Sequence, residues 1–294
     1  MRAARASIGL THQAFLDLVL QAPHIEPAEL GALADLAKAR GIRVLEGGGQ
    51  QAMRLIDVSP TPALTDACAH AGIDHALVTP ELRRDRVGLV AMDMDSTLIT
   101  IECIDEIADM LGIKPQVAAI TASTMRGEID FRQSLTRRVA LLEGLPVTAL
   151  QRVYDERLRL SPGAERMLQG FKAIGAKTLL VSGGFTFFTD RLRERLGLDE
   201  SLSNVLEIAD GKLTGRIQGS IVDASAKAER LSALRARYVG DDGIAIAIGD
   251  GANDVPMLER ADISVAYHAK PVVRALATYA IDHCGLDAVL NLFD

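Results

Sequence analysis

The chain has 294 residues, of which 48% are apolar and 24% are charged, and its formal net charge is −7. Such a composition is typical of a globular protein with one large domain or two. The acidic balance argues against nucleic acid as a partner, because domains that bind it carry basic patches. No apolar stretch approaches the roughly 18 residues that cross a membrane. The three cysteines are widely spaced, with no metal-site spacing, which favours a reduced, cytoplasmic protein.

Residues 1–85 are predicted to form a small domain of their own. Helical segments at 27–41 and 61–72 each begin next to a proline and end at a glycine. Strand-like runs lie at 14–23, 42–46, 51–58 and 74–80, and the second and third flank a glycine run that is typical of a hairpin. The order β-α-β-β-α-β predicts a ferredoxin-like domain.

Residues 86–294 are predicted to form an α/β domain with a Rossmann-like parallel sheet. Nearly continuous apolar runs lie at 87–92, 177–182, 244–249 and 263–267, with helical segments between them. Continuous runs are typical of parallel strands covered on both faces, and ligands of such sheets bind beyond the carboxyl ends of the strands. Three of the runs deliver polar or flexible groups to that edge: Asp93 and Asp95, then Ser182 and Gly183, then Asp250, Asn253 and Asp254.

The first two apolar runs are separated by roughly 80 residues, far more than an ordinary crossover needs. Residues from about 102 to 158 are predicted to be helical, so we expect a small helical cap inserted over the strand ends. The segment 161–176 resumes the core, with Ser161 predicted as the N-cap of its helix and Pro162 as the first helical residue. A hairpin is expected around Asp210 and Gly211.

The two acids at 93 and 95 admit several interpretations. They could be turn residues or helix caps that face water. A calcium loop is excluded, because Leu98 and Ile104 stand where it needs glycine and glutamate. The catalytic alternative is phosphoryl transfer, in which Asp93 attacks phosphorus and Asp95 protonates the leaving oxygen. Since an anion would then attack an anion, this chemistry predicts Mg²⁺ held by carboxylates, with Asp250 as a ligand from a second strand.

A lysine is also expected near a bound phosphate. Lys227 falls in the first turn of the helix predicted at 222–238. A cation there is mildly disfavoured by the helix dipole unless an anion binds at the same helix start. A solvated surface lysine is the alternative, and spacing alone does not decide between the two.

These motifs resemble the haloacid dehalogenase superfamily, whose four motifs appear in order: DMDST at 93–97, Ser182 after a strand, Lys227, and GDGANDVPML at 249–258. Two longer stretches, 93–108 and 125–145, are similar to the phosphoserine phosphatases within that superfamily. The resemblance covers residues 87–294. It implies the superfamily fold, Mg²⁺ dependence and a covalent aspartyl-phosphate intermediate.

Carried over by position, the resemblance implies a role for each motif residue. Asp93 matches the nucleophile and Asp95 the general acid and base. The metal would be held by Asp93, the backbone carbonyl of Asp95, and Asp250. The remaining matches bind phosphate or support the metal and the phosphate: Ser182, Gly183, Lys227, Asn253 and Asp254.

The cap residues are implied to hold an amino acid. Glu102 and Arg138 match the groups that bind its ammonium and its carboxylate, and arginine suits carboxylate geometry. Met125 and Phe131 match the apolar lining of the pocket. Each has a plainer alternative: a solvated helix residue for Glu102, a basic face shared with Arg137 for Arg138, and core packing for the two apolar residues.

The resemblance implies hydrolysis of O-phospho-L-serine to L-serine and phosphate, the last step of serine biosynthesis. One alternative is a relative that acts on another phosphomonoester or moves phosphate to an alcohol. Another is an amino-acid-sensing regulator whose phosphatase domain is inactive. The N-terminal domain is similar in element order to the ACT-like regions that precede some phosphoserine phosphatases, which implies amino-acid sensing or pairing of two copies into a homodimer.

Overall fold

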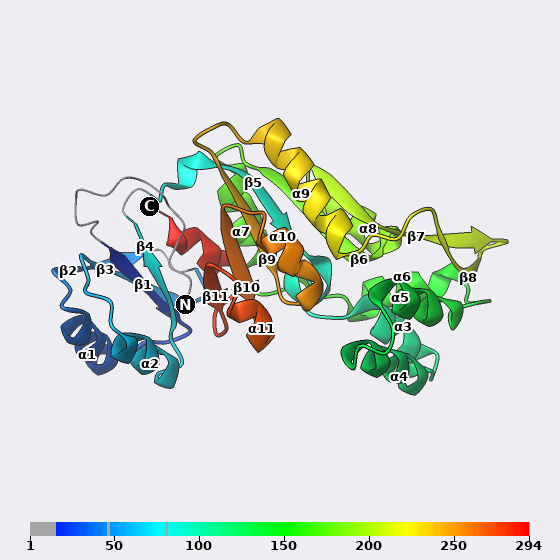
Figure 1. The fold of residues 1–294 in the computed structure, drawn as a ribbon, viewed down its shortest axis with the longest axis horizontal. Coiled ribbons are helices and arrows are strands. Elements are labelled where there is room, and N and C mark those ends of the chain that lie inside the picture. The colour runs from blue at the N-terminus through cyan, green and yellow to red at the C-terminus, as the bar shows by residue number, and fades with distance from the viewer. Residues whose placement is uncertain (1–15, 46–47, 80–81, 294) are drawn as a thin grey trace.

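The computed structural model describes residues 16–45, 48–79 and 82–293, which contain two β-sheets (Figure 1). The first is a four-stranded antiparallel sheet with the strand order β2-β3-β1-β4. Its elements follow the predicted β-α-β-β-α-β order, so the ferredoxin-like arrangement is confirmed. They are β1 (Asp17–Ala22), α1 (Pro27–Ala37), β2 (Gly41–Leu45), β3 (Gln51–Ile56), α2 (Pro62–His70) and β4 (Asp74–Val78).

Two helices pack on one face of this first sheet. Both begin with a proline, whose fixed φ suits the first turn of a helix. Thr61 caps α2, because its side-chain oxygen accepts a hydrogen bond from the Leu64 amide at 3.2 Å. Leu33 of α1 and Cys68 of α2 belong to one buried apolar cluster with sheet residues Leu18, Leu20 and Leu55.

The second sheet has seven strands in the order β11-β10-β9-β5-β6-β7-β8. Neighbouring strands are parallel except β7 and β8, which form the hairpin expected around Asp210 and Gly211. This arrangement confirms the predicted Rossmann-like fold class. The strands are β5 (Val87–Met92), β6 (Lys177–Phe185), β7 (Glu200–Ala209), β8 (Lys212–Gln218), β9 (Ile244–Gly249), β10 (Ile263–Tyr267) and β11 (Tyr279–Ile281).

Helices cover both faces of the seven-stranded sheet. Alternate residues of β5 belong to different apolar clusters: Val90 and Met92 to one, Leu89 and Ala91 to the other. A strand covered on both faces buries every residue, which is why its sequence is continuously apolar. The flanking helices are α7 (Ala164–Lys172), α8 (Thr186–Leu196), α9 (Ala224–Tyr238), α10 (Val255–Leu258) and α11 (Pro271–Arg274).

The start of α7 differs from the prediction. The helix begins at Ala164 with Gly163 as its N-cap, and Ser161 and Pro162 precede it. Gly163 has a left-handed φ of +75°, and a Cβ there would lie 2.1 Å from an Asp287 side-chain oxygen. Only glycine fits this close approach, so the Ser161 cap predicted from the local sequence was wrong because a distant residue decides the turn.

The insertion between β5 and β6 is helical, as expected. Its elements are α3 (Cys103–Met110), α4 (Lys114–Met125), α5 (Phe131–Ala140), α6 (Val147–Arg152) and a π-helical turn (Val153–Arg157). This cap lies at the opposite end of the molecule from the N-terminal domain and next to the β7–β8 hairpin (Figure 1). Three backbone hydrogen bonds join its α5–α6 connection to that hairpin: Gly144 N to Leu213 O at 2.8 Å, Leu213 N to Leu145 O at 2.8 Å, and Val147 N to Gly211 O at 3.0 Å.

The C-terminal 3₁₀ turn, Leu286–Leu292, is buried along its whole length. It packs against the N-terminal sheet, where the Gln21 side chain donates to Ala288 O at 3.2 Å and accepts from the Asn291 amide group at 2.8 Å. The buried carboxylate of Asp74 accepts from the backbone amide of Cys284 at 2.9 Å, just before this turn. Both sheets therefore share the C-terminal segment as a packing partner.

Candidate active site

The two acids follow β5 directly and are held by different backbone amides. The Met94 amide donates to Asp93 Oδ1 at 2.8 Å. Ser96 has a left-handed φ of 55°, and beyond this turn the Cys103 amide donates to Asp95 Oδ1 at 2.9 Å. Burial, and then the nearby Glu102 carboxylate, raise the pKa of Asp95 to about 7. Asp95 can therefore carry a proton near neutral pH.

Lys227 lies beneath Asp93 rather than on the surface. Its ammonium group is 2.8 Å from Asp93 Oδ1 and 2.8 Å from Asp254 Oδ1, with only 1% of its side chain exposed. Burial alone would lower the pKa of Lys227, but the carboxylates of Asp254 and Asp93 outweigh it and raise that pKa. The structure thus brings together a permanently charged lysine and the first acid of the motif, and the alternative of a solvated lysine does not hold.

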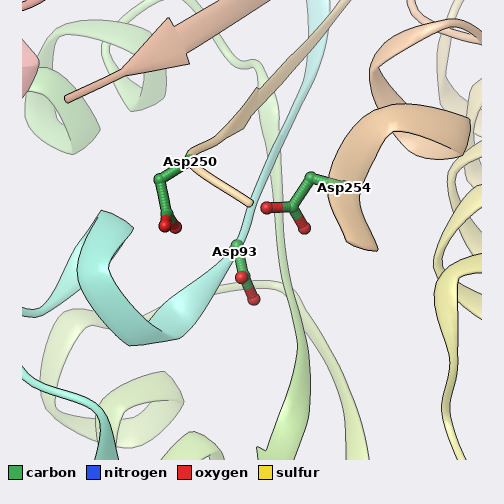
Figure 2. Close-up of side chains that lie close together, drawn as sticks. All are labelled: Asp93, Asp250 and Asp254. Carbon is green, nitrogen blue, oxygen red and sulfur yellow. The ribbon is translucent and has the colours of Figure 1, made fainter. Parts of the chain in front are cut away.

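Three carboxylates converge at the ends of β5 and β9. Oxygens of Asp93, Asp250 and Asp254 lie within 4.8 Å of one another, and Figure 2 shows the three side chains close together. Burial, and then the Asp254 carboxylate, raise the pKa of Asp250 to about 6. Such a set of hard oxygen donors, which destabilise one another when charged, can hold a divalent metal ion.

The carboxylate cluster includes Asp254, and the backbone carbonyl of Asp95, which is no side-chain ligand, stays a prediction. We expected the backbone carbonyl of Asp95 beside Asp93 and Asp250, and Asp254 in a supporting place. The carboxylate of Asp95 is turned toward Cys103, while Asp254 joins the cluster because a short 3₁₀ turn, Ala252–Asp254, follows β9. Asp254 is tied down by Lys227 on one oxygen and by the Gly251 amide, at 3.0 Å, on the other.

The end of β6 supplies a close backbone approach to the acids. Ser182 Oγ accepts a hydrogen bond from the Gly184 amide at 2.8 Å. A Cβ on Gly183 would lie 2.9 Å from the ring of Phe131, and one on Gly184 would lie 2.9 Å from Asp95 Oδ2. A side chain at either position would therefore displace Phe131 or Asp95, and glycine lets the strand end lie close to both.

A cavity of about 750 Å³ lies between these strand ends and the cap. Ten of the predicted site residues line it, whereas Lys227 and Asp254 lie behind Asp93 and do not. Asn253 stands on the sheet side, and Met125, with 70% of its surface exposed, belongs to the cap side. The lining members are Asp93, Asp95, Glu102, Met125, Phe131, Arg138, Ser182, Gly183, Asp250 and Asn253.

The cap side of the cavity carries an incompletely satisfied arginine. Within the described part of the chain, Arg138 Nε is buried and has no hydrogen-bond partner. Burial lowers the pKa of Arg138, although Asp105 and Glu102 partly offset this effect. Glu102 itself accepts a hydrogen bond from Ser96 Oγ at 2.7 Å. The cavity that Asp93 lines therefore also offers a guanidinium and a carboxylate.

Two residues of the site were not predicted. Thr97, fully buried, donates to Asp250 Oδ1 at 2.9 Å and so connects the two acidic strand ends. Asn204 of β7 donates to Gly183 O at 2.8 Å and accepts from the Val222 amide at 2.8 Å, which fixes the glycine peptide. Thr97 belongs to the DMDST motif, so its sequence position was a signal, whereas no motif or pattern marks Asn204.

Known proteins match both parts of the chain. The family model of haloacid dehalogenase-like hydrolases matches residues 90–259, and residues 18–67 match a family described as a domain of unknown function. A phosphoserine phosphatase of Polaromonas sp. (strain JS666) is 54% identical over 221 residues, which are 74% of this chain and 94% of that protein.

Solved structures agree with this relationship. The unliganded crystal structure of a probable phosphoserine phosphatase from Vibrio cholerae superposes with a TM-score of 0.81 at 37% identity, covering 94% of this chain and 85% of that one. A structure described as a phospho-aspartyl intermediate analogue of phosphoserine phosphatase gives a TM-score of 0.65 at 36% identity, over 71% of this chain and all (100%) of that one. The chain belongs to the haloacid dehalogenase-like hydrolases, in the phosphoserine phosphatase branch.

Proposed function

We propose that this protein is a phosphatase that hydrolyses O-phospho-L-serine to L-serine and phosphate, the last step of serine biosynthesis. The observation that carries the proposal is that Asp93, Glu102 and Arg138 line one cavity. Asp93 and the strand ends around it suit a phosphate, whereas Glu102 and Arg138 suit an amino-acid zwitterion; we call these two groups the phosphate end and the amino-acid end of the cavity. The curated relative from Polaromonas, named for this activity, supports the same substrate.

Asp93 is proposed as the nucleophile. Oδ1 of this residue is occupied by the Met94 amide and by Lys227, while Oδ2 has no hydrogen-bond partner among the described residues. Attack by a carboxylate oxygen on phosphorus would form an aspartyl-phosphate and release the serine oxygen. The solved phospho-aspartyl analogue of a relative supports such an intermediate.

Asp95 is proposed as the general acid and then the general base. With a pKa of about 7 it can be protonated in the first step and donate to the leaving serine oxygen. The resulting carboxylate can then take a proton from the water that hydrolyses the aspartyl-phosphate. Because the Cys103 amide holds Oδ1 at 2.9 Å, the carboxyl group keeps one orientation through both steps.

Mg²⁺ is proposed as the metal, held by Asp93, Asp250 and the backbone carbonyl of Asp95. The carboxylates fit a small hard cation, since their oxygens cluster within 4.8 Å and Asp250 has a raised pKa in the absence of a counter-ion. Asp254, whose oxygens already accept from a lysine and an amide, would position the others. When bound, the ion would offset the charge of the phosphate and the attacking carboxylate.

The remaining predicted residues are proposed to bind substrate. Ser182 and the Gly183 amide would hold phosphate oxygens, with Asn253 at the same edge of the cavity. Lys227 would attract the same phosphate from behind Asp93, whose Oδ1 it contacts at 2.8 Å. Arg138 would pair with the substrate carboxylate, which supplies the partner that its buried Nε lacks. Glu102 would accept from the substrate ammonium, and the apolar groups that would line the pocket are Met125 and Phe131.

We also propose a cytoplasmic location and a homodimer. Cys68, Cys103 and Cys284 are all free and buried, as expected of a protein from a reducing compartment. Edge strand β2 exposes Ile42 and Val44, at 49% and 75%, which an antiparallel neighbour from a second copy would cover. In the described residues, no helix has the length and apolar character that a membrane crossing requires.

Substrate profiling of the purified protein tests the proposed function. With Mg²⁺ present we expect phosphate and L-serine to be released from O-phospho-L-serine much faster than phosphate is released from phosphothreonine or sugar phosphates, and chelation of Mg²⁺ should stop the reaction. Little preference among these esters would overturn the substrate assignment. A protein that releases no phosphate from any phosphoamino acid would favour the regulator alternative.

A further inference from the structure

The first turn of cap helix α5 lies against two elements of the phosphate end. Phe131, its first residue, approaches Gly183 so closely that a Cβ there would be 2.9 Å from the ring. The next residue, Arg132, reaches the start of α9, the helix that carries Lys227. The start of α5, on the cap, therefore contacts both the end of β6 and the start of α9.

The contact between Arg132 and Asp223 is an ion pair across the cap boundary. Arg132 Nε and Nη2 lie 2.8 Å and 2.6 Å from Asp223 Oδ2. Oδ1 of the same carboxylate accepts from the Ala226 amide at 3.1 Å as the N-cap of α9. This amide first, and Arg132 less strongly, hold the pKa of Asp223 below its usual value. The Asp223 carboxylate thus caps α9 and binds the cap at the same time.

Asp223 connects directly to the phosphate end of the cavity. The backbone amide of Lys227 donates to Asp223 O at 3.1 Å, and the Lys227 ammonium contacts Asp93 at 2.8 Å. A continuous set of contacts therefore runs from Arg132 on the cap, through the first turn of α9, to the acid proposed to attack phosphorus.

This pair differs from the other ion pairs of the cap. Among those recorded for the described residues, Arg126–Glu128, Arg152–Glu156 and the pairs of Arg157 and Lys114 join two cap residues. Arg132–Asp223 joins the cap to the sheet domain. It is also accessible to solvent, with 58% of the Arg132 side chain exposed, so water can replace it when the cap moves. The backbone hydrogen bonds to the β7–β8 hairpin attach the cap at another place and involve no side chain that can swing away.

We propose that Arg132 is a positioning residue for the amino-acid part of the substrate. Through its ion pair with Asp223 it holds α5, and with it Arg138, against the helix that carries Lys227. The pair favours the closed cavity before substrate arrives, so its loss lowers the fraction of protein that is competent to bind and raises KM by the same factor. This inference rests on the proposed function, because it names a residue that controls the KM for phosphoserine.

The test is a double-mutant cycle with Arg132→Ala, Asp223→Asn and both together. Asparagine caps a helix as well as aspartate does, so Asp223→Asn removes the ion pair and keeps the start of α9. Arg152→Ala is the matched control, since it removes an exposed pair that lies within the cap. Each variant is assayed with O-phospho-L-serine and with an aryl phosphate that has no amino-acid part. Hydrogen exchange of the substrate-free proteins is measured in parallel.

We expect each single change to raise KM for phosphoserine about two- to fivefold, the range that an exposed ion pair supplies, with kcat nearly unchanged. The double variant should show no further loss, and Arg132→Lys should restore part of it. Turnover of the aryl phosphate should change less than twofold. Exchange should become faster in residues 103–157 and stay the same in the N-terminal domain.

Three results would overturn the proposal: additive losses in the double variant, equal losses on the aryl phosphate, or the same loss from Arg152→Ala. Unchanged exchange in 103–157 would overturn it as well. Failure of the proposed function is a separate outcome, because a wild-type protein that leaves phosphoserine intact refutes the substrate. The exchange experiment still decides whether the ion pair holds the cap.

Discussion

The phosphate end and the amino-acid end of the cavity differ in whether their charges already have partners. Asp93 and Lys227 are buried together at 2.8 Å, whereas Arg138 Nε is buried and, within the described residues, unpaired. Removing one partner of a buried ion pair is costly, because it leaves an uncompensated buried charge. A buried polar group without a partner costs free energy until a ligand supplies one. Changes at the paired phosphate end should therefore affect mainly the stability of the protein, and changes at the amino-acid end mainly substrate recognition.

The largest effect should come from the centre of the phosphate end. Asp93→Asn removes the proposed nucleophile, and we expect kcat to fall by about 10⁴-fold or more, as happens when one member of a catalytic unit is removed. Mass spectrometry of the intact variant, stopped in acid during turnover, should show no phosphorylated protein. Wild-type protein treated in the same way is the control. A phosphorylated Asp93→Asn variant would contradict the assignment.

Lys227→Met tests how much the paired charges at the phosphate end matter for the stability of the protein. It leaves the Asp93 and Asp254 carboxylates buried without their cation, so we expect the free energy of unfolding to drop by about 3–5 kcal/mol. Urea denaturation without Mg²⁺ measures this loss. Arg138→Ala, assayed in the same way, should lower the free energy of unfolding much less or raise it, because it removes an unsatisfied buried nitrogen. Equal losses of unfolding free energy in the two variants would show that the two ends do not differ in their importance for stability.

Arg138→Ala should instead weaken recognition of the phosphoserine carboxylate. A hydrogen-bonded ion pair to the substrate carboxylate is worth about 1.5–3 kcal/mol, so we expect kcat/KM for phosphoserine to fall about 10- to 100-fold. Turnover of an aryl phosphate, which has no carboxylate, should be nearly unaffected. Steady-state kinetics on both substrates check this split. Similar losses on both would mean that Arg138 maintains the structure of the cap.

The smallest effect concerns pH and sharpens the role of Asp95. Its pKa is raised to about 7 by burial and then by Glu102. The acid form, present below that pKa, must donate to the serine oxygen, so kcat/KM for phosphoserine should decline above about pH 7 and approach a tenfold loss per pH unit. An activated aryl leaving group needs no proton, and its kcat/KM should show no such decline. A parallel decline for both substrates would assign the titration to another group.

Much of this site could be predicted because its residues follow buried strands. Continuous apolar runs located β5, β6 and β9, and parallel strands share one carboxyl edge, so Asp93, Ser182 and Asp250 were expected together. It was harder to predict which charged side chains pair with one another and which are buried. The burial of Lys227 between Asp93 and Asp254, and the glycine approach to Asp287 that displaces the start of α7, depend on contacts between residues far apart in the chain. Local patterns contain no information on such contacts.

The buried C-terminal turn has a consequence for how the protein unfolds. Val19 and Val78 of the N-terminal sheet belong to the same apolar cluster as Leu290 and Phe171 of the phosphatase part. Two regions that share one core cannot lose it separately, because the melting of either exposes the apolar surface of the other to water. The two domains should therefore melt in one cooperative transition, and a destabilising substitution in the N-terminal sheet should be felt as a lower temperature of inactivation at an active site on the far side of the molecule.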